Sequence, residues 1–171
     1  DVMLPWTDDL PATVRAAYGE ELVDHLPELL WELPDGKISV VRYHYHDHIA
    51  ERFAEAFADT CGRWCGEHGL MLTGHMMEEP TLCSQTAALG ETMRSYRSFQ
   101  LPGIDMLCAR FELTTAKQAQ SAVHQYGRCG MTSELYGVTG WDFDFRGHKI
   151  HGDWQAALGV TVRVQHLSWV S

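Results

Sequence analysis

Apolar residues gather along the chain in short runs that end in small or polar residues. Residues 70–75 read LMLTGH, and comparable runs occupy residues 104–107, 131–135 and 160–166. Short apolar runs of this kind are typical of strands in a parallel sheet, which is covered on both faces. Polar residues follow because the carboxyl end of such a strand meets solvent and ligand. The pattern therefore predicts four strands with chemistry at their carboxyl ends.

Apolar residues at helical spacing occupy much of the remaining sequence. Residues 10–30 carry such a stripe, and the interruptions at Gly19 and Pro27 predict two short helices. A longer stripe runs from Ile49 to Cys65, and Gly69 suits the end of that helix. Residues 113–126 and 148–158 predict further helices. Residues 80–100 are polar and long, and they predict a lid or binding loop.

Strands that alternate with helices predict a parallel sheet built from βα units. The sequence contains no glycine-rich nucleotide motif, and polar residues at repeated strand ends suit a (β/α)8 barrel. A complete barrel needs about 250 residues, whereas this chain has 171. We therefore expect an α/β fold in which residues 1–171 form a single partial-barrel domain, a fragment of a larger protein.

Composition and charge narrow the classes of ligand and partner. The formal net charge of −10 argues against nucleic acid, because phosphate binding needs a basic surface. No apolar run is long enough for a membrane span, and no signal peptide is evident. We therefore expect no membrane association and either a cytoplasmic location or one that this sequence does not specify. The five cysteines are irregularly spaced and predict free thiols that are mostly buried. A neutral ligand such as a carbohydrate fits this composition.

One histidine-rich segment raises a metal hypothesis. His44, His46 and His48 surround Asp47 within five residues. The three imidazoles would share one face of a strand but not of a helix, and the residues that follow are helical. We place the start of that helix near His46 or Asp47. A metal-dependent enzyme that uses this cluster therefore remains an alternative, and the leading interpretation has no metal.

Carboxylates lie beyond the first strand and near the end of the third. Glu78 and Glu79 follow the first strand, and Glu134 lies 55 residues beyond Glu79. Glu79 shares the parity of His75 if the chain stays extended, so it and Glu134 can project into one mouth of the sheet. Two facing carboxylates supply the general acid and the base or nucleophile of glycoside hydrolysis. The spacing therefore predicts a glycosidase.

Other side chains near the strand ends suit sugar binding. Aromatic faces stack on sugar rings, whereas imidazole, carboxylate and guanidinium groups hydrogen-bond to hydroxyls. The candidates are His75, Tyr136, Trp141, Asp142, Asp144, Arg146, His166 and Trp169. Ca²⁺ is the one cofactor considered, because aspartates can ligate it.

Four segments together resemble the catalytic barrel of large bacterial glycosidases. These are LTGHMMEE at residues 72–79, PGIDML at 102–107, SELYG at 133–137 and GDWQAALGV at 152–160. The closest resemblance is to α-L-rhamnosidase-like proteins of glycoside hydrolase family 106. This resemblance implies a (β/α)8 barrel and a catalytic pair formed by Glu78 or Glu79 together with Glu134.

Two departures from this pattern affect the expectations. We count the two glutamates two strands apart, whereas retaining barrels of this broad class place them three apart, so an inverting pair is equally compatible. Half a barrel also leaves sheet edges unpaired, which predicts self-association and an inactive isolated segment. A non-catalytic carbohydrate-binding or interaction module is the competing class of protein.

Overall fold

A computed structural model describes residues 4–167, and Trp169 therefore lies outside the described residues. The chain divides into two compact units, one that ends at Arg52 and one that begins at Phe53. The single partial-barrel domain stays a prediction. None of the helices in residues 4–167 has the length and apolar character needed to cross a bilayer.

The first unit is a small helical assembly. It contains α1 (Leu10–Tyr18), a 3-10 turn at Leu22–His25, α2 (Leu26–Leu30), a second 3-10 turn at Pro34–Gly36 and most of α3 (Val40–Phe53). Gly19 ends α1 in the left-handed region with φ +75°, which explains why the apolar stripe breaks there. The buried core of this unit comprises Leu10, Val14, Leu22, Leu29, Val41 and Tyr45.

The histidine-rich segment is helical throughout. α3 begins at Val40, so the prediction of a helix start near His46 or Asp47 is wrong. In the second unit, a π-helical turn (Ala54–Asp59) and α4 (Thr60–Glu67) come next in the chain. The apolar stripe beyond Ile49 had predicted only the later part, because polar histidines conceal the helical pattern of the earlier turns.

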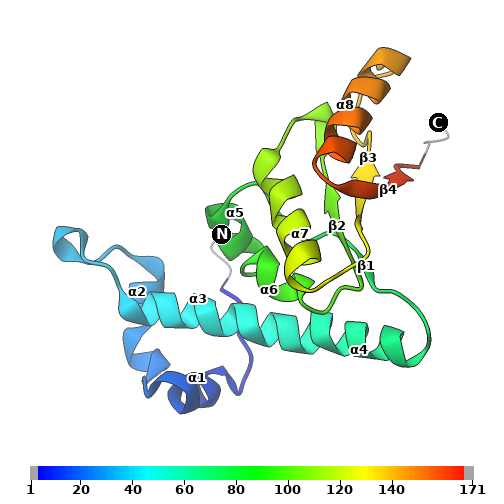
Figure 1. Cartoon of the computed structure of the whole chain (residues 1–171). Coiled ribbons are helices and arrows are strands. Elements are labelled where there is room, and N and C mark those ends of the chain that lie inside the picture. The colour runs from blue at the N-terminus through cyan, green and yellow to red at the C-terminus, as the bar shows by residue number, and fades with distance from the viewer. Residues whose placement is uncertain (1–3, 168–171) are drawn as a thin grey trace. The chain divides into compact units, whose positions relative to one another are not determined.

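The second unit is built on one four-stranded sheet (Figure 1). β1 (Thr73–Gly74), β2 (Leu101–Asp105), β3 (Met131–Leu135) and β4 (Val160–Gln165) lie in sequence order. All three neighbouring pairs are parallel. The predicted α/β fold with a parallel sheet is confirmed, and closure of the strands into a (β/α)8 barrel stays a prediction.

Helices connect the strands. α5 (Leu82–Ala88) and α6 (Thr92–Tyr96) lie between β1 and β2, so residues 80–100 are largely helical and not an irregular loop, and a role of this segment as a lid stays a prediction. A capping box formed by Thr81 and Ser84 starts α5. α7 (Leu113–Gln125) follows β2 and a short 3-10 turn at Leu107–Ala109, and α8 (Phe145–Ala157) follows β3. Because the helices carry the chain back between parallel strands, the carboxyl ends of all four strands lie at the same edge of the sheet.

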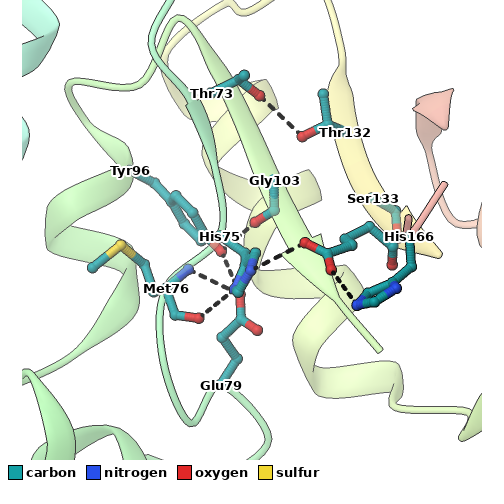
Figure 2. Close-up of polar contacts among 10 residues, drawn as sticks. Thr73, His75, Met76, Glu79, Tyr96, Gly103, Thr132, Ser133 and His166 are labelled. Carbon is teal, nitrogen blue, oxygen red and sulfur yellow. Dashed lines mark hydrogen bonds and ion pairs between the residues drawn. The ribbon is translucent and has the colours of Figure 1, made fainter. Parts of the chain in front are cut away.

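The two faces of the sheet differ in chemistry. Ile104, Met131 and Val160 belong to the apolar core together with three alanines of α7, Ala116, Ala119 and Ala122. The opposite face carries polar groups between β1 and β3, where the hydroxyls of Thr73 and Thr132 lie 3.0 Å apart (Figure 2). Gly103 lies between them, and a Cβ there would come within 2.4 Å of the Thr132 hydroxyl. A residue without a side chain is therefore required at position 103.

Candidate functional site

The carboxyl ends of the four strands bring together four titratable side chains. His75 follows β1 directly, Asp105 is the last residue of β2, Glu134 lies in β3 and His166 follows β4. The register pairs Asp105 with Glu134, so both carboxylates leave the same face of the sheet. The backbone N–H of His166 donates to Leu135 and continues the pairing of β4 beyond its end.

Glu134 lies between two imidazoles. Its Oε2 is 3.6 Å from His75 Nε2 and its Oε1 is 3.8 Å from His166 Nε2. Figure 2 shows His75 and His166, and dashed lines mark the contacts of both imidazoles with this carboxylate. The Glu134 side chain is 34% exposed, which leaves it accessible to a ligand. The sequence-predicted residues His75, Glu134 and His166 therefore do come together.

Asp105 belongs to this cluster, although sequence reasoning did not single it out. Its Oδ1 is buried and has no hydrogen-bond partner among the described residues. Burial raises the pKa of Asp105; the Glu134 charge adds to that rise, whereas His75 and His166 oppose it. The predicted strand at residues 104–107 placed Asp105 in mid-strand. The polar residue at the end of an apolar run was the signal that could have identified it.

Glu79 reaches the site by a turn and not by an extended strand. β1 ends at Gly74, and Glu78 has the left-handed φ of +58°, so the parity argument for Glu79 is wrong. The Glu79 side chain is almost fully buried, with the residue 4% exposed. The amides of Gln85 and Gln118 donate to its backbone carbonyl at 2.7 and 3.0 Å and fix the turn.

Burial makes the Glu79 carboxyl keep its proton to a higher pH than usual. Loss of solvation raises its pKa to about 7, although His75, Tyr96 and the backbone N–H of Met76 act in the opposite direction. That N–H donates to Glu79 Oε1 at 3.3 Å. The carboxyl is therefore available as a proton donor near neutral pH.

Tyr96 connects Glu79 to the sheet. Its buried hydroxyl lies 3.0 Å from Glu79 Oε1 and 2.6 Å from the carbonyl oxygen of Gly103 (Figure 2). A phenol has one hydrogen to share between these two acceptors. Donation of this hydrogen to Glu79 favours the carboxylate form and so lowers the pKa of Glu79.

Glu78 has a different environment from its neighbour. It is exposed, and its backbone carbonyl accepts a hydrogen bond from the Ser84 hydroxyl at 2.8 Å. Both glutamates line a cleft of about 460 Å³, whose wall also includes His75 and Asp105. Glu112 adds a further carboxylate to this wall and Arg110 a cation. The polar side chains of the cleft are therefore mainly carboxylates, and they lie beside apolar lining residues such as Met77 and Leu107.

The remaining predicted binding residues lie after β3. Tyr136 donates its hydroxyl to the backbone of His148 at 3.1 Å, and Asp144 accepts from the Gly147 N–H at 2.8 Å as the cap of α8. Trp141 is 97% exposed. Asp142 and Asp144 line a second hollow of about 350 Å³. Arg146 is exposed in the first turn of α8. Asp144 thus has a structural role that its sequence context did not reveal.

Metal-ligating groups gather at one place in residues 4–167. Ligand atoms of His75, Asp105 and Glu134 all lie within 4.8 Å of one another. The histidines of α3 are engaged otherwise: His44 contacts Glu20 at 2.8 Å and His48 contacts the Thr13 hydroxyl at 2.9 Å. The side chains that could hold a metal ion in the described residues therefore differ from the histidine cluster of the sequence-based alternative, and a metal at either place stays a prediction.

Comparisons with known proteins add no family. No protein-family model, no curated protein and no solved structure matches this chain. The functional argument therefore depends on the residues and their geometry.

Proposed function

We propose that this chain contains the catalytic residues of a glycoside hydrolase, with Glu79 as general acid and Glu134 as base or nucleophile. Glycosidases need two carboxyl groups whose environments keep one protonated and the other ionised. Glu79 is buried with a pKa raised to about 7, whereas Glu134 is one-third exposed between two imidazoles. This contrast between two glutamates at one edge of the sheet is the observation that carries the proposal.

Glu79 rather than Glu78 is the proposed acid. Glu79 is almost fully buried and its turn is fixed by two glutamine amides, whereas Glu78 is exposed. A general acid must be held in place and must be protonated at the working pH. The acidic cleft suits a neutral sugar whose hydroxyls donate hydrogen bonds. The exposed ring of Trp141 supplies an apolar face for a neighbouring sugar ring.

The test is a panel of aryl glycosides assayed on the longest natural protein that contains this chain. Glu79→Gln and Glu134→Gln should each lower kcat by roughly 10²–10⁴-fold, because each removes a proton-transfer group and keeps the shape. Glu78→Gln is the matched control and should keep kcat within about tenfold, because that residue holds no proposed proton. Equal losses in Glu78→Gln and Glu79→Gln would contradict the assignment of the acid.

A non-catalytic carbohydrate-binding module is the second candidate, favoured by the 97% exposure of Trp141. Such a module binds sugar without turnover. Binding of an oligosaccharide that is lost in Trp141→Ala but unchanged in Glu134→Gln, with no hydrolysis of any glycoside in the panel, would favour this candidate over the enzyme.

A further inference from the structure

Two imidazoles lie beside the Glu134 carboxylate with their Nε2 atoms toward it. His75 Nδ1 lies 2.9 Å from the carbonyl oxygen of Met76, and His166 Nδ1 lies 2.9 Å from that of Leu167. A carbonyl oxygen only accepts, so each Nδ1 donates a hydrogen to it. The Nε2 atoms, 3.6 and 3.8 Å from the Glu134 oxygens, are therefore the ring nitrogens placed to ligate a cation beside this carboxylate.

We propose that His75, Asp105 and Glu134 bind one divalent transition-metal ion, with His166 as a further ligand. The three ligating atoms come from the ends of three adjacent strands and lie within 4.8 Å of one another. Ligand bonds of about 2.0–2.2 Å hold donor atoms about 3–4 Å apart, so small side-chain rotations complete the site.

Asp105 supplies independent support for a cation at this place. Its Oδ1 is buried without a hydrogen-bond partner among the described residues. A buried carboxylate oxygen that lacks a partner is costly, and a metal ion would satisfy it directly. The neighbouring carboxylate of Glu134 repels that of Asp105. A cation bound by both carboxylates would neutralise this repulsion.

The donor set selects the class of ion. Imidazole nitrogens beside carboxylates suit Zn²⁺, Co²⁺, Mn²⁺ or Fe²⁺, whereas Ca²⁺ and Mg²⁺ prefer oxygen ligands alone. The hydrogen bonds from each Nδ1 to a backbone carbonyl are the outer contacts that orient metal-binding histidines. His75 and Asp105 also line the 460 Å³ cleft, so a ligand in the cleft has access to the ion.

This inference does not depend on the proposed glycosidase. If Glu134 is the base or nucleophile, an ion that occupies its carboxylate removes that group from the reaction. Added Zn²⁺ should then inhibit turnover, and a chelator should restore it. Metal binding is measured without substrate, so the failure of either proposal is distinguishable from the failure of the other.

The experiment titrates Co²⁺ into the untagged, metal-free protein, followed by absorption spectroscopy and calorimetry. We expect one equivalent to bind with visible d–d bands. His75→Ala and Asp105→Asn should each weaken binding at least tenfold. His124→Ala is the matched control, since His124 is an exposed histidine of α7, and it should bind as the parent does.

Circular dichroism of each metal-free variant establishes that it is folded. His75 is exposed beyond the end of β1, so His75→Ala leaves the core intact and keeps the test valid if another variant fails to fold. Absence of stoichiometric Co²⁺ binding to the parent would overturn the proposal. Equal binding by the parent and His75→Ala would overturn it too, as would Ca²⁺ displacing Co²⁺ at equal concentration.

Discussion

Glu79 is a carboxyl group in an almost dry environment, with neighbours that act on its proton in opposite directions. Burial favours the neutral form, whereas His75, the Tyr96 hydroxyl and the Met76 N–H favour the carboxylate, and the Asp105 charge opposes them. The neutral form prevails up to a pH of about 7. If Glu79 is the general acid, the activity of the parent protein should fall as the pH rises through this value.

Tyr96→Phe should extend activity to higher pH. Removal of the hydroxyl takes away a hydrogen bond that stabilises the Glu79 carboxylate, so the pKa of Glu79 rises further. The measurement is kcat/KM against pH for both proteins, whose basic limb reports the acid in the free enzyme. A general loss of structure would lower activity at every pH without moving the limb. A limb displaced to lower pH would contradict the role assigned to Tyr96.

Glu79→Gln should stabilise the fold in alkaline solution while it removes turnover. A carboxyl with a raised pKa contributes most stability below its unfolded pKa, and the contribution is lost as the pH rises to about 7. Glutamine has no such dependence. Urea denaturation should therefore show that the free energy of unfolding falls less from pH 5 to pH 8 in the variant than in the parent protein. Identical pH dependence in both proteins would indicate that Glu79 is solvated.

At the scale of the elements, Gly103 fixes how β1, β2 and β3 approach one another. A Cβ at this position would lie 2.4 Å from the Thr132 hydroxyl and 2.5 Å from the backbone oxygen of Gly74. Because the second neighbour is backbone, the clash cannot be relieved by a side-chain rotation. Gly103→Ala should lower the free energy of unfolding by about 1–3 kcal/mol, measured by urea denaturation.

Gly66→Ala is the matched control for this substitution. Gly66 lies in α4, and the nearest atom to its added Cβ is Gln100 Nε2 at 3.9 Å, an ordinary contact. Alanine is the better helix former by up to about 1 kcal/mol, so this variant should be as stable as the parent or more so. Equal stability of the two alanine variants would show that the strands can separate without cost.

The elements also show what the sequence was able to reveal. Apolar runs identified the neighbourhood of all four strands; in β2 and β3 the run reflects burial within the sheet, whereas β4 is apolar in sequence although most of its residues are exposed. The first and last residues of the strands were harder to predict. The apolar run at residues 70–75 predicts a six-residue strand, whereas β1 is only Thr73–Gly74. Strand length depends on pairing with β2, and pairing is a tertiary property.

The residues of the candidate site also fall into those that the sequence revealed and those that depend on tertiary structure. Glu134 and the two histidines were predicted because they occupy strand ends. Glu79 was selected for the wrong geometric reason, since a turn and not an extended strand carries it. Asp105 was not singled out, because the position of a strand's last residue depends on register. The orphaned Asp105 oxygen and the imidazole tautomers are features of side-chain packing that a sequence does not display.

At the scale of the whole molecule, one face of the sheet packs on helices, whereas on the other face the side chains of β4 are exposed to solvent. The register places Val162 and Val164 on the same face as Thr132 and Glu134, opposite the α7 core. These valines are 42% and 48% exposed. In the part of the chain that the structure describes, β4 pairs with β3 and stands at the end of the strand order.

An exposed strand edge with apolar residues is a template for pairing with a second chain. We therefore predict that the isolated chain self-associates through β4, as seen by light scattering over a concentration series. Val162→Lys combined with Val164→Lys should shift it toward the monomer, because lysines on an edge strand oppose its pairing with a strand of another chain. Val138→Lys adds a charge at a residue that is 68% exposed outside the sheet and should leave association unchanged. A parent chain that stays monomeric at high concentration would show that its sheet edge needs no partner.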